Sequence, residues 1–199
     1  IVYVTTITTQ PTTPSAICVG GTASITVAAS LNGGSGSLSY QWQSSPDGSS
    51  SWTDVTVGTG ITTANYITDN LITTTWFRCK ITSSTTSCTL FSNGVKVTVV
   101  PDPSITVQPT SGTICVGGNY TLSVTATNGT PSLTYQWQSS TTSGSGFTDI
   151  SGATNPNLSV TSLTQTTYYR VNVSASGNGC NTITSSEAAV VVIPDPIIA

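Results

Sequence analysis

The sequence predicts an all-β chain made of two tandem antiparallel β-sandwich domains, and three observations support this prediction. The segment Tyr-Gln-Trp-Gln-Ser-Ser occurs at residues 40–45 and again at residues 135–140. The offset of 95 residues between Tyr40 and Tyr135 is the length of a whole domain, so the chain is a tandem repeat. Around both copies, large apolar residues alternate with Ser, Thr and Gln, as they do in half-buried strands. The sequence has no helical periodicity that is longer than one turn.

The composition excludes several classes of partner. Charged residues make up 6 % of the chain, against about a quarter in ordinary domains. With four Lys and Arg residues and a net charge of −3, the chain has no basic face for nucleic acid or anionic lipid. No run of about 18 apolar residues is present, so we expect no direct membrane insertion. Disorder is disfavoured because Val, Ile, Tyr and Trp recur with a period of about two residues.

The repeat sets the expected domain boundaries. We expect the end of a preceding repeat at residues 1–5, repeat one at 6–101, repeat two at 102–194, and a linker with the start of a further repeat at 195–199. The sequence Pro-Asp-Pro closes each unit, at residues 101–103 and 194–196. Two prolines in so short a linker make it stiff, so we expect the units to form an extended array. A chain without Met that begins at Ile1 is interpreted as a piece of a longer protein.

About seven strands are expected in each unit. In repeat one they lie near residues 7–11, 23–29, 38–43, 52–55, 66–71, 76–81 and 95–99, and in repeat two near residues 105–109, 120–126, 133–138, 147–150, 158–163, 168–173 and 188–192. A proline in the first strand, Pro11 or Pro109, marks that strand as an edge. A pair of glycines precedes the second strand and permits a sharp turn, and Asn- and Gly-containing turns precede the third.

The third strand and the sixth strand supply the expected core. Alternation places Tyr40 and Trp42 on one face, and it does the same for Tyr135 and Trp137. We predict that the two Trp residues are the central core side chains. The sixth strand adds inward aromatic residues, Phe77 in repeat one and Tyr169 in repeat two, while Arg78 and Lys80 point outward.

Several segments carry a resemblance to a known family. Tyr-x-Trp on the third strand resembles an immunoglobulin-type sandwich. The combination of Cys-Val-Gly-Gly, Tyr-Gln-Trp-Gln-Ser-Ser, Trp-Thr-Asp-Val and Thr-Tyr-Tyr-Arg-Val is more specific. It resembles the Ig-like repeats of very large Bacteroidota surface adhesins exported by the type IX secretion system, such as the SprB-like gliding-motility adhesins. The resemblance implies an extracellular, cell-surface location, with neighbouring Ig-like repeats, surface polysaccharide or other adhesin and secretion components as partners.

The five cysteines are divided by the repeat alignment. Cys18 aligns with Cys115, Cys88 aligns with Cys180, and Cys79 aligns with a valine. We therefore predict the disulfides Cys18–Cys88 and Cys115–Cys180, each worth on the order of 4 kcal/mol through the unfolded chain. Cys79 is left as a buried, unreactive thiol. The alternative is reduced structural thiols at the paired positions.

The sequence carries little catalytic chemistry. There is no His, and seven scattered acids offer no carboxylate pair for acid–base work, so we expect no enzyme, no cofactor and no metal site. The recurring Asp54 and Asp149 are interpreted as polar strand ends, and one Asp in each linker is too little for calcium. The outward amides of the third strand could bind sugars beside an aromatic ring, or could lie on a plain solvated face; they are Gln41, Gln43, Gln136 and Gln138.

Two hypotheses for the function follow. The first is a structural and adhesive stalk segment of a large secreted bacterial surface adhesin, involved in gliding motility or surface attachment. The second is a carbohydrate- or protein-binding accessory module of a secreted multidomain enzyme. The first is favoured by the whole-domain repeat, the stiff linkers and the scarcity of catalytic groups.

Overall fold

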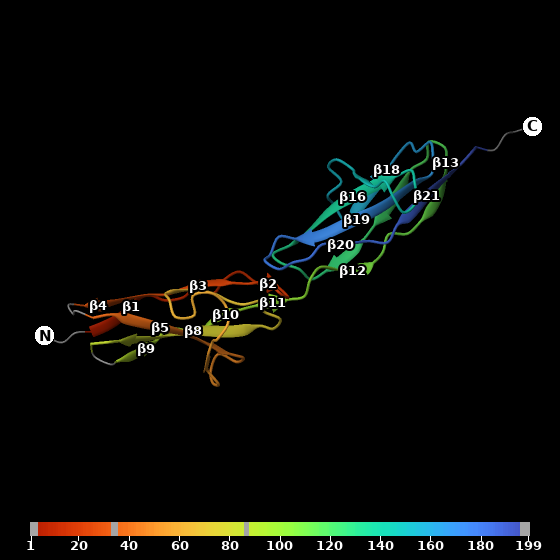
Figure 1. Ribbon diagram of the computed structural model, residues 1–199. Coiled ribbons are helices and arrows are strands. Elements are labelled where there is room, and N and C mark those ends of the chain that lie inside the picture. The colour runs from red at the N-terminus through yellow and green to blue at the C-terminus, as the bar shows by residue number, and fades with distance from the viewer. Residues whose placement is uncertain (1–3, 33–35, 86–87, 196–199) are drawn as a thin grey trace, which may run out of the picture. The chain divides into compact units, whose positions relative to one another are not determined.

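The computed structural model describes residues 4–32, 36–85 and 88–195. They form two compact units (Figure 1). The first holds the described residues up to Pro101 together with residues 177–179, and the second holds the other described residues from Asp102 onward. Each unit is a β-sandwich, as the alternation predicts, and none of the described segments is a helix long and apolar enough to cross a membrane. The expected pieces of neighbouring repeats at residues 1–3 and 196–199, and most of the glycine turn at 33–35, lie outside the described residues.

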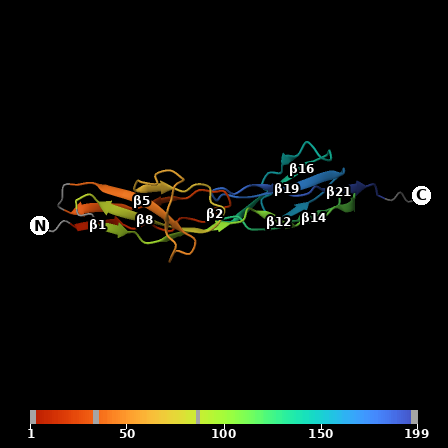
Figure 2. The ribbon, with the colours of Figure 1, turned by 60° about the horizontal axis from the view of Figure 1, so that its bottom comes forward.

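The first unit is built around the pairing of two long strands, β5 (Leu38–Ser45) and β8 (Thr75–Ser83). They pair antiparallel from Leu38↔Ser83 to Ser45↔Trp76, and Figures 1 and 2 show them side by side. In this sheet β10 (Val95–Val97) and β9 (Thr89–Phe91) pair with β8, and β6 (Thr53–Asp54) pairs with β5. The remaining strands form three pairs: β1 (Val4–Thr9) with β4 (Ala28–Asn32), β3 (Ser24–Thr26) with β7 (Asn65–Ile67), and, in parallel, β2 (Ile17–Cys18) with β11 (Val99–Val100).

The second unit repeats this arrangement around β16 (Leu133–Ser140) and β19 (Thr167–Ala175). Its large sheet also contains β17 (Thr148–Asp149), β20 (Ile183–Thr184), β21 (Ala188–Ile193) and β13 (Gly112–Cys115), which runs parallel to β21. Two further antiparallel pairs complete it: β12 (Ser104–Val107) with β15 (Thr125–Thr127), and β14 (Tyr120–Ser123) with β18 (Asn157–Val160).

The second expected strand is divided in both units, which the alternation alone did not predict. In the first unit, β3 pairs with β7 and β4 pairs with β1, so the chain changes partner at the intervening Val27. The Val27 N–H donates to the carbonyl oxygen of Ala64 at 3.0 Å, and at the equivalent point of the second unit Val124 N–H donates to Pro156 at 3.0 Å. The unbroken apolar face therefore spans two strand pairs.

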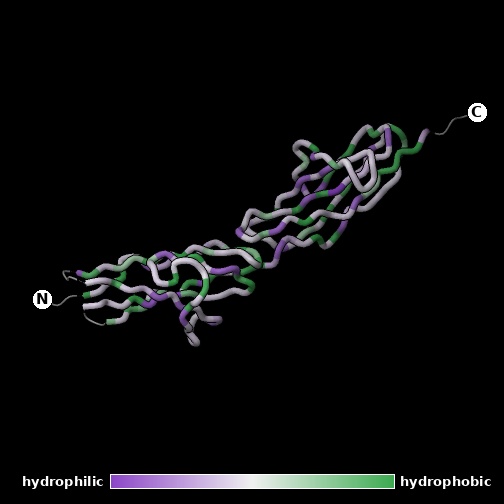
Figure 3. Tube along the Cα trace, viewed as in Figure 1, coloured by the Kyte–Doolittle hydropathy of each residue, from purple (hydrophilic) through white to green (hydrophobic). Residues whose placement is uncertain are grey.

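Each unit has its own hydrophobic core, centred on the Trp of β5 in the first unit and on the Trp of β16 in the second. Trp42 and Trp137 are both 0 % exposed. Phe77 and Tyr169 are buried beside them, whereas Tyr40 and Tyr135 are only half-buried and pack at the margin of each core. Figure 3 shows hydrophobic segments interspersed with neutral and polar ones along the strands of both units.

The indole nitrogens of the two Trp residues are satisfied inside the core. Trp42 Nε1 donates to the carbonyl oxygen of Thr63, and Trp137 Nε1 donates to that of Asn155, both at 2.9 Å. The Trp side chains therefore also fix the loop that follows the short strand β6 or β17. In the first unit, Tyr66 stacks on Trp42 with ring centroids 5.6 Å apart.

The structure corrects both predicted disulfide pairings. Cys18 and Cys180 are each disulfide-bonded, whereas Cys115 is an exposed thiol, so Cys115–Cys180 is not formed. Cys18 lies beside β11, near the start of β8, while the carbonyl oxygen of Cys88 accepts the N–H of Ser83 at the end of β8. The nine residues of β8 place these ends about 25 Å apart, and a disulfide tolerates a Cα separation of about 7 Å at most. The predicted Cys18–Cys88 bridge is therefore also wrong.

Candidate functional site

A row of polar side chains crosses the outward face of the large sheet in the first unit. Strand register places Gln43 of β5 opposite Asp54 of β6 on one side and opposite Arg78 of β8 on the other. Gln43 Nε2 donates to Asp54 Oδ1 at 2.8 Å, and Arg78 Nε donates to Gln43 Oε1 at 2.9 Å. The amide thus bridges an anion and a cation, using its donor toward one and its acceptor toward the other.

The same row is present in the second unit. Gln138 Nε2 donates to Asp149 Oδ1 at 2.7 Å, and Arg170 Nε donates to Gln138 Oε1 at 2.7 Å. Strand alternation predicts that these Gln side chains point outward, and the recurring Asp is interpreted as a strand end. The connection to Arg is not predicted, although the recurrence of Asp, Gln and Arg at matching positions in both repeats is a signal for it.

Aromatic rings cover the guanidinium groups at the end of each row. The Arg78 guanidinium lies 4.4 Å from the centroid of the Trp52 ring and 4.3 Å from that of Phe91. The Arg170 guanidinium lies 4.2 Å from the centroid of the Phe147 ring. Such contacts stabilise a cation over the face of the ring by about 0.5–1 kcal/mol at exposed sites. The two rows therefore differ in the number of rings that hold the Arg.

The other pair of outward amides binds the backbone. Gln41 Nε2 donates to the carbonyl oxygens of Trp42 at 2.9 Å and Val55 at 3.3 Å. Gln136 Nε2 makes the equivalent bonds to Trp137 and Ile150, both at 2.9 Å. Because these amides bind within their own unit, a sugar on this face would have to compete with the existing bonds.

Buried serines make two further recurring sets of contacts that strand alternation does not predict. Ser45 Oγ accepts the N–H groups of Asp47 and Gly48 and donates to the carbonyl oxygen of Ser50, and Ser140 binds its loop in a similar way. Ser185 Oγ accepts the N–H of Val171 at 2.9 Å, as Ser92 does from Cys79 at 2.8 Å. Recurrence at matching positions was again the available signal.

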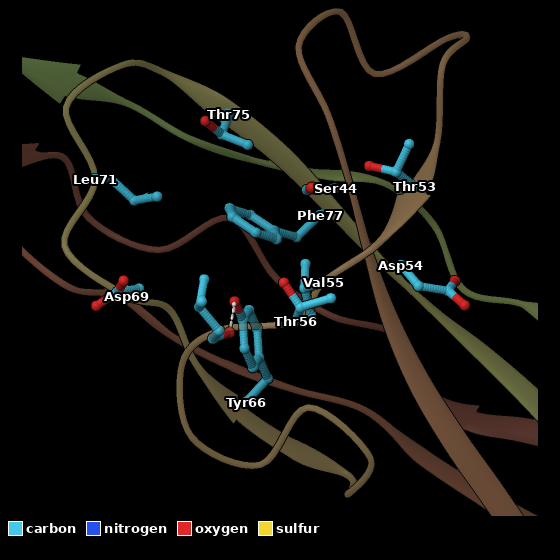
Figure 4. Close-up of a pocket in the computed structure, with 11 residues that line it drawn as sticks. Ser44, Thr53, Asp54, Val55, Thr56, Tyr66, Asp69, Leu71, Thr75 and Phe77 are labelled. Atoms are coloured by element: carbon cyan, nitrogen blue, oxygen red, sulfur yellow. Dashed lines mark hydrogen bonds between the residues drawn. The ribbon is translucent and has the colours of Figure 1, made fainter.

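A shallow pocket of about 300 Å³ lies in the first unit (Figure 4). It is lined by Phe77, Tyr66, Leu71, Thr56 and Asp69 among others. Tyr66 donates to the carbonyl oxygen of Val57 at 3.1 Å, and burial, with a smaller contribution from the Asp69 charge, raises the pKa of Tyr66, which keeps its hydroxyl protonated. The second unit has a pocket of about 350 Å³ lined by Ser, Thr and Gly residues. Its Ser139, Thr148 and Thr167 hold the strand positions that Ser44, Thr53 and Thr75 hold in the first pocket.

The titratable groups offer little chemistry. Burial raises the pKa of the Cys79 thiol to about 12, and the thiol lies opposite Trp42, so Cys79 is a buried apolar side chain in practice. Hydrogen bonds from Ser50, and then from Ser49 and Ser45, lower the pKa of Asp47, whose carboxylate closes the loop after β5. Within the described residues, no three His, Cys, Asp or Glu side chains are grouped so that they could hold a metal ion.

Solved structures similar to the chain are tandem immunoglobulin domains. The three N-terminal domains of the bacteriophage RB49 highly immunogenic outer capsid protein match 96 % of the chain at 13 % identity, with a TM-score of 0.60. An I-band fragment of titin matches 98 % of the chain at 9 % identity, with a TM-score of 0.57. Immunoglobulin domains 1–4 of Sidekick-1 match 95 % at 15 % identity, with a TM-score of 0.50.

These likenesses establish the fold of the chain. The chain spans 70 %, 67 % and 48 % of those three solved structures. The predicted fold class, two tandem Ig-like antiparallel sandwiches, is therefore confirmed. No curated protein sequence matches the chain. The family model described as Domain of unknown function (DUF8696) matches residues 6–101 and again residues 104–194, so the chain belongs to this family and carries two copies of its domain.

Proposed function

We propose that the chain is a structural and adhesive stalk segment of a large secreted bacterial cell-surface adhesin, of the type IX-secreted kind that it resembles. The observation that carries the proposal is the row of Asp, Gln and Arg on the large sheet, which recurs in both units with its polar groups bound inside each unit. A sheet face whose side chains hold one another is suited to stiffening a module. The likeness to tandem Ig domains supports a structural or adhesive module.

The cysteines support an extracellular location for this stalk. Cys18 and Cys180 are disulfide-bonded, and disulfides persist mainly in oxidising compartments such as the cell exterior. The partners that follow from the proposal are neighbouring Ig-like repeats, with surface polysaccharide or other adhesin and secretion components at the ends of the array. The proposed stalk supports gliding motility or attachment to a surface.

Two measurements test the stalk proposal in the organism that makes the protein. Antibodies raised against the 199-residue chain should label intact, unpermeabilised cells, and in-frame removal of residues 6–194 should reduce gliding or attachment while the rest of the protein is still exported. As a matched control, the Thr161→Ala variant, at an exposed position outside the row, should be exported and should leave the cells adherent. Labelling confined to permeabilised cells, or full attachment after removal of the segment, would contradict the proposal.

A second candidate function is carbohydrate binding, and the pocket of the first unit is the observation that favours it. Hydroxyls, the Asp69 carboxylate and the ring of Phe77 meet there, a mixture of polar and apolar groups that suits a sugar. A glycan array probed with the chain should show binding that Asp69→Ala abolishes and Thr161→Ala, at an exposed position of the second unit, preserves. Absence of binding across a broad array would count against this candidate.

A further inference from the structure

We propose that Cys115 is a cross-linking cysteine, whose thiol forms a disulfide with a further copy of this domain. This inference rests on the proposed function, because it requires that the domain works in an array. It assigns Cys115, at the end of β13, as a covalent site and names a further copy of the domain as its partner.

The first supporting observation is the setting of Cys115. It is the last residue of β13, where it lies opposite Ile193 of β21, and its thiol is exposed. Val116 follows it, with its N–H bound to the carbonyl oxygen of Ile193 at 3.1 Å, and the Val116 and Ile193 residues are 47 % and 45 % exposed. A thiol flanked by uncovered apolar side chains is a surface suited to contact with another protein.

The second observation is independent and comes from the equivalent residue of the first unit. Cys18 ends β2 opposite Val100 of β11 in the same parallel arrangement, and Val19 N–H binds the carbonyl oxygen of Val100 at 3.1 Å. Cys18 is disulfide-bonded and 0 % exposed. The same backbone position of the domain therefore holds a disulfide in one copy and an exposed thiol in the other.

No other cysteine of the second unit can form a disulfide with Cys115. β21 pairs with the start of β19 at Thr167, and the end of β21 lies opposite Cys115. Cys180 follows the other end of β19, so it is remote from Cys115. The position of Cys79 is filled by Val171 in this unit. The partner must therefore lie outside the unit. A further copy of the same domain supplies a cysteine at the Cys180 position, the other position at which the structure holds a disulfide.

The bond forms by ordinary thiol–disulfide exchange. The Cys115 thiol and the partner thiol lose two protons and two electrons between them, and one S–S bond forms. A disulfide oxidant, such as oxidised glutathione or an oxidised dithiol protein of the secretory compartment, accepts the electrons and protons and leaves as two thiols. No other co-reactant is needed.

The test uses a chain of three domains, residues 1–194 followed by a second copy of residues 102–194. After folding in a glutathione redox buffer, non-reducing peptide mapping should find Cys115 of the middle domain bonded to the Cys180 position of the added copy, while Cys115 of the added copy remains a thiol. In the original 199-residue chain, Cys115 should be labelled by a maleimide under native conditions. The matched control Cys79→Ala should leave both results unchanged.

Several results would overturn the inference. They are a Cys115 of the middle domain that remains a labelled thiol, one that carries only glutathione, or one bonded within its own domain. The Cys115→Ser variant of the three-domain chain should leave the Cys180 position of the added copy open to labelling, and its continued protection would also overturn the inference. Because cell-surface labelling and attachment test the stalk proposal separately, a surface-exposed stalk with an unbonded Cys115 would refute the cross-link alone.

Discussion

The indole Nε1 of Trp137 donates a hydrogen bond to the carbonyl oxygen of Asn155 at 2.9 Å. A fully buried ring thus joins the centre of the second core to the loop after β17, and Ala153, in the same loop, accepts the backbone N–H of Trp137 at 3.0 Å. Trp137 therefore positions a loop as well as filling the core. The same pair of bonds links Trp42 to Thr63 and Ile61 in the first unit.

Replacing Trp137 separates these two contributions. Trp137→Phe keeps an aromatic ring but leaves the Asn155 carbonyl without its donor, which should cost about 1–3 kcal/mol. Trp137→Ala also opens a cavity and should cost about 3–5 kcal/mol. Urea denaturation followed by circular dichroism measures both, with Thr161→Ala, at an exposed position outside the core cluster, as a control. Equal losses for Phe and Ala would show that the hydrogen bond rather than the ring volume dominates.

The recurring row predicts a coupling between Gln138 and Arg170. Gln138→Ala removes the acceptor of Arg170 Nε and the donor to Asp149, so we expect a loss of about 1–2 kcal/mol of unfolding free energy. In a double-mutant cycle, Arg170→Ala should cost less in the Gln138→Ala background than in the wild type. Additive losses measured in urea would show that the row contributes nothing beyond its separate side chains.

The number of rings around each Arg gives a matched comparison between the units. Arg78 contacts two rings and Arg170 contacts one. A Lys lacks both the Nε that binds Gln and the planar group that stacks, so Arg78→Lys should destabilise its unit more than Arg170→Lys does, by about 0.5–1 kcal/mol. Thermal unfolding of the two variants checks this order. Equal shifts would mean that the second ring is not a stabilising contact.

Much of the fold could be predicted from the sequence because strand alternation and repetition are local signals. The central strands were placed correctly by Tyr-Gln-Trp-Gln-Ser-Ser, since alternation decides which side chains face inward. The partners of Gln43 and Gln138 could not be predicted, because they depend on the register of each central strand against its two neighbours. The disulfide prediction failed for a related reason: the alignment of Cys18 with Cys115 and of Cys88 with Cys180 shows that positions recur, and it carries no information about the distance between them.

Ser185 shows how a short polar side chain completes the sheet. Its Oγ accepts the N–H of the fully buried Val171, and the Ser185 N–H donates to the Val171 carbonyl oxygen. Ser185→Ala would leave a buried N–H without an acceptor, and we expect a loss of about 1–3 kcal/mol. The exposed neighbour Ser186 is the control, since Ser186→Ala should change stability by less than about 0.5 kcal/mol. Indistinguishable denaturation midpoints for the two variants would contradict this role of Ser185.

The pKa of Cys79 predicts how stability and reactivity depend on pH. Burial raises the pKa from 9.0 to about 12, so the folded unit holds the neutral thiol more strongly than the unfolded chain does. For a raised pKa, the associated stability is fully present below pH 9.0 and is lost as the pH rises toward about 12. Native labelling with a maleimide at neutral pH should therefore reach Cys115 and spare Cys79, which should react only after denaturation. If Cys79 is labelled as fast as Cys115 in the folded chain, the side chain opposite Trp42 is not held in a closed core.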